Sequence, residues 1–277
     1  MNQVENVLKN IRKVYFMNKF EPSVVISNYN KDCTVYETID AIKNAGFRNV
    51  FIEWFNNDYG WEVSQEDQLK YAREKGLNVI FAHLGYKNIN DLWIEEETGI
   101  VDKYKKDIKA CSDNNIPMVC MHLTSKEVAP QYGTTGLKRI REICEYAKSL
   151  NVKVAFENTK IKGYLDYVIE NIKDDNVGIC FDSGHYHAHF KDDLDFSKFK
   201  DRIFCIHLHD NDGTGDQHLL PFDGTLDWVE TVNKLKEGNY DGPITLEIHH
   251  RNDYESMTLD EFYKKGYALA LRIKNMF

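Results

Sequence analysis

The feature that most constrains the fold is a regular alternation of short apolar runs and longer amphipathic segments. The short runs are rich in β-branched and aromatic residues, as β-strands are, and the longer ones have helical periodicity. Eight strands are predicted: Ser23–Ser27, Asn49–Trp54, Asn78–His83, Met118–Leu123, Lys153–Asn158, Gly178–Asp182, Ile203–His209 and Ile244–His249. Eight helices are predicted: Thr34–Ala45, Ser64–Lys75, Gly99–Asn114, Gly136–Leu150, Tyr164–Ile172, Leu194–Phe199, Leu226–Glu237 and Leu259–Asn275. Because parallel strands need helical crossovers, this alternation predicts an α/β fold, a (β/α)8 TIM barrel.

The helix ends agree with this assignment. Ser64 precedes an acidic first turn, as an N-cap does, and Gly46 and Gly76 stand where left-handed C-caps favour glycine. Residues 1–20 also have apolar residues at helical spacing, which predicts an extra N-terminal helix. An open doubly wound sheet is the alternative, but no Gly-x-Gly-x-x-Gly follows the first strand. Without a linker or an internal repeat, residues 1–277 are expected to form a single domain.

Charge and cysteine usage limit the partners and the compartment. The chain has 35 Lys and Arg against 44 Asp and Glu, a formal charge of −9, which disfavours broad nucleic-acid binding but leaves a local basic groove open. It has no signal-peptide pattern and no apolar run that could span a bilayer, so we expect a cytoplasmic protein. Its six cysteines include no Cys-x-x-Cys pair, and Cys120, Cys180 and Cys205 are interpreted as buried free thiols.

Titratable residues gather at the ends of the predicted strands, where a TIM barrel has its active site. They are His83, His122, Glu157, Asp182, His209 and Glu247. The alternation of side chains allows each of them to point into the barrel. A buried carboxylate such as Glu157 or Glu247 needs a cation, which predicts a divalent metal at the barrel mouth. The stretch Ile203–Trp228, with Asp216 and His218, is the densest part of this pattern.

These motifs resemble the xylose isomerase-like TIM barrel superfamily, which contains sugar-phosphate isomerases and epimerases and is related to AP endonucleases of the endonuclease IV type. The matching segments are Ala155–Asn158, Phe181–His185, His207–Asp212, Asp216–Trp228 and Leu246–Glu247. They cover the C-terminal half of the chain, whereas the N-terminal half matches by strand rhythm only. The set is specific for the superfamily and weak for any one activity.

The resemblance to the epimerases implies one divalent ion (Mn, Co, Mg or Zn) held by Glu157, Asp182, His209 and Glu247. Glu157 and Glu247 would also be the catalytic residues, passing a proton between the two faces of a substrate carbon. His185 is similar to a histidine that contacts a substrate oxygen in that group. His207 is interpreted as a structural residue or as one that supports a ligand.

The resemblance to the endonucleases implies more ligands. His83, His122, Asp216 and His218 match the additional histidines and the Asp-x-His motif of that branch, so two or three Zn ions are an open alternative. Such a site suits phosphodiester hydrolysis. If Asp216 and His218 only form hydrogen bonds, the site has a single ion.

The loops favour a small substrate over a DNA duplex. Those after the first three predicted strands are acidic or neutral and rich in aromatic residues, and Trp54 and Trp61 suit stacking on a sugar ring. The epimerases often have an Arg that contacts phosphate or ketose a few residues beyond the histidine that corresponds to His209. This chain has Asp212-Gly213 there, so its sequence does not predict that contact. The favoured function is a divalent-metal-dependent isomerase or epimerase of a sugar, sugar phosphate, polyol or keto acid, working by proton transfer between two metal-bound glutamates. A multinuclear-zinc phosphodiesterase or AP endonuclease and a non-catalytic binding barrel are the alternatives, and a homo-oligomer is compatible with all three.

Overall fold

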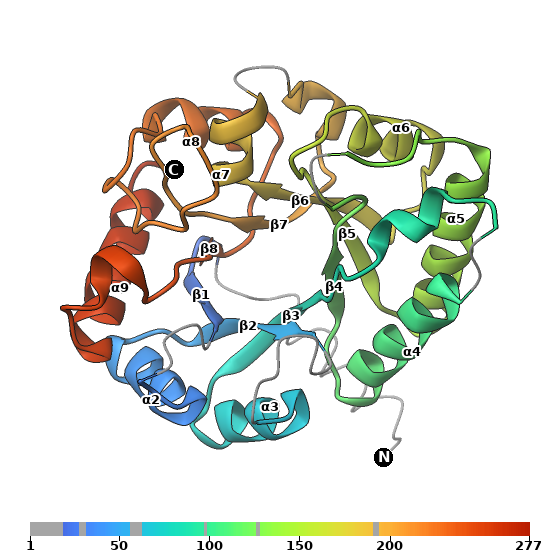
Figure 1. The fold of residues 1–277 in the computed structure, drawn as a ribbon. Helices are drawn as coiled ribbons and strands as arrows, with labels where there is room; N and C mark the ends of the chain where they lie inside the picture. Colours follow the sequence, from blue (N-terminus) through green and yellow to red (C-terminus); the bar gives the residue numbers. More distant parts are fainter. Residues whose placement is uncertain (1–18, 28–31, 56–62, 97–98, 126–127, 191–193) are drawn as a thin grey trace, which may run out of the picture.

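The computed structural model describes residues 19–27, 32–55, 63–96, 99–125, 128–190 and 194–277. Its strands are all parallel and follow the order β7-β6-β5-β4-β3-β2-β1-β8. They are β1 (Pro22–Ile26), β2 (Asn49–Trp54), β3 (Asn78–Leu84), β4 (Met118–Met121), β5 (Lys153–Glu157), β6 (Val177–Asp182), β7 (Ile203–His207) and β8 (Ile244–Leu246). The two edges meet where Leu208 N donates to Thr245 O at 2.9 Å and Glu247 N donates to Leu208 O at 3.1 Å. The predicted TIM barrel is therefore confirmed (Figure 1).

Helices surround the ring of strands (Figure 1). The α-helices are α2 (Val35–Ala45), α3 (Gln65–Glu74), α4 (Ile100–Asp113), α5 (Thr134–Ser149), α6 (Tyr164–Asn171), α7 (Ser183–His185), α8 (Trp228–Glu237) and α9 (Leu259–Lys274). Short helices of other types are η1 (Ile89–Trp93), η2 (Tyr186–Phe190), η3 (Phe196–Phe199) and η4 (Asn252–Tyr254). Within the described ranges, every helix is too short or too polar to cross a lipid bilayer.

Local sequence signals set the helix ends. Thr34 and Thr258 each begin a helix with a capping box, in which the threonine and a glutamate three residues later satisfy each other's backbone N–H groups. Gly46 ends α2 with a φ of 109°, a left-handed conformation that suits glycine. These caps explain why the predicted bounds of α2 and α9 lie close to the observed bounds.

Three strands end two or more residues earlier than predicted. β4 ends at Met121 instead of Leu123, β7 ends at His207 instead of His209, and β8 ends at Leu246 instead of His249. The chain leaves the sheet after β7 because Asp210 pairs with Leu219 through two backbone hydrogen bonds, of 2.9 and 3.0 Å, in an antiparallel bridge. This bridge folds the following loop back over the barrel mouth.

Two helical predictions also need comment. The segment predicted as helix Leu194–Phe199 is a short 3-10 helix at Phe196–Phe199, capped by the Asp195 side chain. The predicted N-terminal helix falls almost entirely on residues outside the described ranges, and Lys19 and Phe20 form a turn. The single domain over residues 1–277 stays a prediction.

The barrel interior is apolar at its centre and polar at the carboxyl ends of the strands. Phe51 and Phe81 stack with ring centroids 4.5 Å apart, and the His207 ring stacks on Phe51 at 4.9 Å. Side chains two residues further along their strands, Glu53 and His83, share the same face as these phenylalanines. The transition from packed rings to titratable groups therefore places a polar site directly on top of the core.

Candidate metal centre

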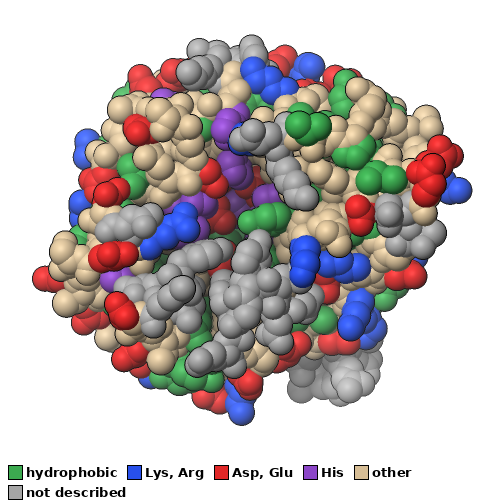
Figure 2. Space-filling view, viewed as in Figure 1, with side chains coloured by type: hydrophobic (Ala, Val, Ile, Leu, Met, Phe, Trp, Pro, Cys, Tyr) green, Lys and Arg blue, Asp and Glu red, His purple; other side chains and the backbone are tan. Residues whose placement is uncertain are grey.

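Three buried carboxylates lie at the carboxyl ends of β5, β6 and β8. Glu157, Asp182 and Glu247 are 1%, 0% and 6% exposed, and histidines surround them. Figure 2 shows the result as a hollow in which purple and red side chains lie together, with Lys and Arg scattered around it. Buried carboxylates are costly without positive partners, so this cluster requires protonated histidines or a cation.

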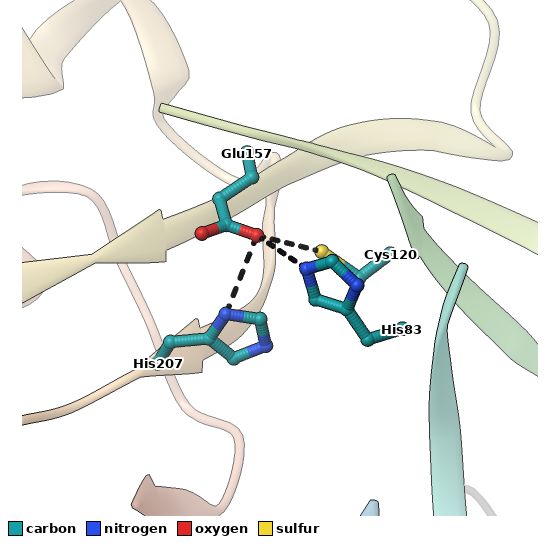
Figure 3. A group of neighbouring side chains, drawn as sticks. All are labelled: His83, Cys120, Glu157 and His207. Atoms are coloured by element: carbon teal, nitrogen blue, oxygen red, sulfur yellow. Dashed lines mark hydrogen bonds and ion pairs between the residues drawn. The ribbon is translucent and has the colours of Figure 1, made fainter. Parts of the chain in front are cut away.

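Glu157 is the centre of one half of the site (Figure 3). Its Oε2 atom lies 3.1 Å from His83 Nε2, 3.4 Å from His122 Nε2 and 3.4 Å from His207 Nδ1. Its Oε1 atom lies 3.1 Å from His185 Nδ1. The predicted strand-end histidines of β3 and of the segment after β4 therefore reach the same carboxylate.

Asp182 and Asp216 organise the other half. His209 Nε2 lies 3.2 Å from Asp182 Oδ2 and 3.6 Å from Asp216 Oδ1. Asp216 Oδ2 lies 3.1 Å from His218 Nε2 and 3.5 Å from His185 Nε2. The loop residues Asp216 and His218 thus face the strand-end residues, and His185 connects the two halves.

His207, interpreted from the sequence as a structural residue or one that supports a ligand, lies among the carboxylates of the site. Its Nδ1 atom lies 3.4 Å from Glu157 Oε2, 3.3 Å from Glu247 Oε2 and 3.9 Å from Asp182 Oδ2. The sequence signal was its position in β7, two residues before His209 and on the same strand face. A buried carboxylate in β2, Glu53, was also missed, although it alternates with the core residue Phe51.

The donor set fits a divalent metal. Within the described residues, both ring nitrogens of His207 and Nδ1 of His209 are buried and form no hydrogen bond. One set of ligand atoms within 4.8 Å of one another comes from Glu157, Asp182, His207 and Glu247. A second such set comes from His209, His218 and Glu247. Imidazole nitrogens combined with carboxylate oxygens are the ligands that Zn²⁺, Mn²⁺ and Co²⁺ accept, and the two sets share Glu247.

The two glutamates have opposite pKa shifts. Burial raises the pKa of both, but at Glu157 the imidazoles of His207 and His122 outweigh it, so this pKa lies well below its usual value. At Glu247 the charges of Glu157 and Asp182 add to the effect of burial, so this pKa lies well above its usual value. Glu157 therefore ionises before Glu247.

Metal binding should depend on pH through His185. Burial lowers its pKa, but the carboxylates of Asp182 and Asp216 outweigh burial and hold the pKa well above its usual value. The ion pairs of protonated His185 stabilise the metal-free fold fully below about pH 6.5, and this contribution is lost as the pH rises through the raised pKa. Protonated His185 places a positive charge beside the Asp182 and Asp216 carboxylates and so opposes the binding of a cation there, and this opposition ends when the imidazole loses its proton. We therefore expect the gain in Tm caused by Zn²⁺ to grow from about pH 6 to about pH 8, in thermal unfolding scans. A gain that shrinks over this range would contradict the expectation.

Asp210 holds the loop that carries Asp216 and His218. Its buried carboxylate accepts hydrogen bonds from Phe222 N at 2.9 Å, Leu226 N at 3.0 Å and Trp228 Nε1 at 2.9 Å. Nearby, a side chain at Gly224 would meet Asp210 Oδ1 at 2.3 Å, so only glycine fits there. The conformation of the loop therefore depends on one buried carboxylate.

Asp210→Asn should lower the free energy of unfolding by about 3 kcal/mol, because it weakens several charge-assisted hydrogen bonds in a buried position. Asp212→Asn is the matched control. Asp212 is exposed, and its Oδ1 accepts hydrogen bonds from the backbone N and the hydroxyl of Thr214 in the same turn. It should cost less than about 1 kcal/mol. Urea unfolding of both variants measures the difference, and equal losses would remove Asp210 from this role.

The predicted aromatic contacts are only partly supported. Trp54 is 1% exposed and lies on the opposite face of β2 from Phe51 and Glu53, so it has no surface to offer a sugar and we withdraw that role. Trp61 lies outside the described residues. Tyr86, after β3, stacks on His122 with centroids 4.4 Å apart and an interplanar angle of 11°, so it lies beside the candidate ligands, as does Phe55, whose ring centroid is 5.7 Å from that of His83.

Comparisons with known proteins agree with this fold. Residues 39–269 match the family model described as xylose isomerase-like TIM barrel. An uncharacterised protein of Sinorhizobium fredii, y4fM, is 33% identical over 133 residues, 46% of this chain and 42% of that protein. An inosose isomerase of Halalkalibacterium halodurans is 26% identical over 184 residues, 60% of this chain and 64% of that protein. A probable endonuclease 4 of Mycoplasma mycoides is 28% identical over 145 residues, 43% of this chain and 47% of that protein.

Solved structures extend the similarity over the barrel. The IOLI protein with a bound zinc atom has a TM-score of 0.71 at 16% identity, covering 92% of this chain and 98% of that one. D-psicose 3-epimerase from Clostridium cellulolyticum, solved with D-tagatose, has a TM-score of 0.69 at 13% identity, with the same coverage of 92% and 98%. At these identities the structures show the fold alone. The match to the curated relatives above spans about half of their length (42%, 64% and 47%). Since the family model matches most of the sequence, the chain belongs to the xylose isomerase-like TIM barrel family.

Proposed function

We propose that the protein is a divalent-metal-dependent isomerase or epimerase of a small carbohydrate or a related polyol or keto acid. The observation that carries this proposal is the convergence of Glu157 and Glu247 from β5 and β8. Both approach His207 Nδ1, at 3.4 and 3.3 Å, although β6 and β7 lie between β5 and β8 around the closed barrel. Two carboxylates that reach one buried point from different strands can serve the two faces of a substrate carbon.

Each residue has a separate task in this proposal. Glu157, Asp182, His209 and Glu247 would hold a divalent ion. Glu157, Asp182 and Glu247 have ligand atoms within 4.8 Å of one another together with His207, a further candidate ligand, whereas His209 lies in the group with His218 and Glu247. When bound, the ion polarises a substrate carbonyl and its neighbouring hydroxyl and thereby acidifies the proton on the carbon between them. Glu157, which ionises first, accepts that proton, and Glu247 returns a proton from the other side. His185 lies 3.1 Å from Glu157 and is placed to donate to a substrate oxygen.

Proton exchange in heavy water tests the reaction directly. The enzyme reconstituted with Mn²⁺, Co²⁺, Mg²⁺ or Zn²⁺ should transfer deuterium to the α-carbon of at least one ketose or inosose in a panel, and NMR would detect the label. Glu237→Gln, an exposed change on α8, should leave the exchange rate unchanged. A panel without any exchange, combined with cleavage of abasic DNA, would exclude an isomerase.

Hydrolysis of phosphodiesters is the second candidate, and one observation favours it. His83, His122, Asp216 and His218, the additional ligands of the endonuclease IV type, all contact the carboxylate cluster. Two or three Zn ions would suit this larger set. The number of ions bound by histidine and carboxylate ligands distinguishes the candidates, with any thiolate-bound ion counted separately by spectroscopy. About one such ion per chain supports the isomerase, and two or three zinc ions support the hydrolase.

A further inference from the structure

Three cysteines form a group beneath the histidines and carboxylates. Cys120 in β4, Cys180 in β6 and Cys205 in β7 are 0%, 0% and 2% exposed, and all three are free thiols. Each lies two residues before a polar residue of the site, namely His122, Asp182 and His207. Because side chains alternate along a strand, every cysteine points inward below its polar neighbour. The barrel therefore carries two successive levels of residues that can bind metal.

The sulfur atoms are close enough to share one ion. The three Sγ atoms all lie within 4.8 Å of one another. A tetrahedral ion with metal–sulfur bonds of about 2.3 Å holds its sulfurs about 3.8 Å apart. Because 4.8 Å is the upper limit of the sulfur–sulfur distances, each needs to shorten by at most about 1 Å to reach this spacing.

A fourth ligand is also available. Cys120 Sγ lies 3.4 Å from Glu157 Oε2, and Figure 3 shows the sulfur directed at that carboxylate. Cys120 also belongs to a set of donors within 4.8 Å of one another that includes His83, Glu157 and His207. The interior of a TIM barrel is usually filled by branched aliphatic residues. In this barrel three thiols and a carboxylate stand where such aliphatic residues are usual. Thiolates and carboxylates are ligands of closed sites for soft and borderline metals.

We propose that Cys120, Cys180 and Cys205 form a buried thiolate site for one divalent cation of the zinc group, separate from the histidine–carboxylate centre above it. The ion would replace the three thiol protons, which leave to solvent, and Glu157 or a water molecule would complete the coordination. This inference does not depend on the reaction proposed above, because its three sulfur ligands take no part in that reaction. Glu157 is a donor that both sites could use.

Cadmium NMR and cobalt spectroscopy of the intact, reduced chain test this proposal without any substitution. Metal-free protein loaded with Cd²⁺ should give one resonance in the region of sulfur-rich coordination, apart from that of nitrogen and oxygen sites. Loading with Co²⁺ should produce a thiolate-to-cobalt charge-transfer band in the near ultraviolet. If neither signal appears at saturating metal, the cysteines only fill the core and the proposal is wrong.

Paired variants assign the ligands. Cys180→Ala combined with Cys205→Ala should reduce the charge-transfer band at least about threefold, since two of three thiolates are lost, while cobalt bound to histidine remains visible. The control is Cys111→Ala combined with Cys144→Ala, which removes two buried thiols from α4 and α5 and should leave the band unchanged.

Two results on the variants would overturn the assignment. The band could survive the Cys180/Cys205 pair, or it could disappear only with Cys120→Ala, which would place a single sulfur in the upper centre. Circular dichroism checks that each variant folds. If a variant does not fold, the cadmium resonance of the unsubstituted chain decides whether the thiolate site exists. Loss of the isomerase reaction alone leaves these readouts unaffected, so the two proposals fail independently.

Discussion

Glu247→Gln is expected to lower kcat/KM for α-proton exchange by about 10²- to 10⁴-fold, the usual contribution of a general acid or base. The amide has nearly the shape of the carboxylate, but it cannot carry the proton between the two faces of the substrate. The variant should also bind metal more weakly, because Glu247 belongs to both groups of candidate ligands. Exchange rates and metal content are measured on the same preparation.

The control for this substitution is Glu237→Gln, which makes the same chemical change at an exposed position at the end of α8. Assaying both variants at saturating metal separates a lost proton carrier from a lost ligand. Full activity of Glu247→Gln with metal bound would remove Glu247 from the mechanism, while leaving the metal centre itself in place.

Removal of the metal is expected to lower Tm. The ion would neutralise carboxylates that are buried together, and a ligand present at about 100 times its Kd stabilises the folded state by about 2.7 kcal/mol. For a chain of this size that difference corresponds to a change in Tm of roughly 5 °C or more. Thermal unfolding before and after treatment with a chelator, followed by return of Zn²⁺ or Mn²⁺, measures it.

Asp182→Asn provides the internal comparison, because Asp182 is fully buried and lies within the Glu157, His207 and Glu247 group. In this variant the chelator should change Tm by less than half of the wild-type amount, since a charged ligand has been removed. If the wild-type chain has the same Tm with and without chelator, the cluster does not hold a metal ion under those conditions.

Much of the site was predictable because strand ends can be found locally. In a parallel barrel all carboxyl ends lie on one side, so His83, Glu157, Asp182 and Glu247 were expected together before any contact was known. His185 was placed by resemblance, three residues after Asp182, and it does face Glu157. The roles of these residues in metal binding and catalysis stay predictions.

The contacts that depend on closure of the barrel could not be predicted from the sequence. His207 and His209 share a strand face, and the pattern alone could not tell that His207 contacts both glutamates. Trp54 ends a strand beside the mouth, but the alternation turns it away from Glu53 and into the core. Asp210 lies in the matching segment His207–Asp212, and only the structure shows that its carboxylate fastens the loop through hydrogen bonds.

The sequence alone determines the order and type of the elements, because hydrophobic periodicity and caps act over a few neighbouring residues. It also determines which residues stand at the strand ends. Only the tertiary structure decides which of them meet, since that depends on the tilt and register of strands far apart in the chain. The cysteines of β4, β6 and β7 illustrate this: they are isolated in sequence, and the closed barrel brings their sulfurs within 4.8 Å of one another.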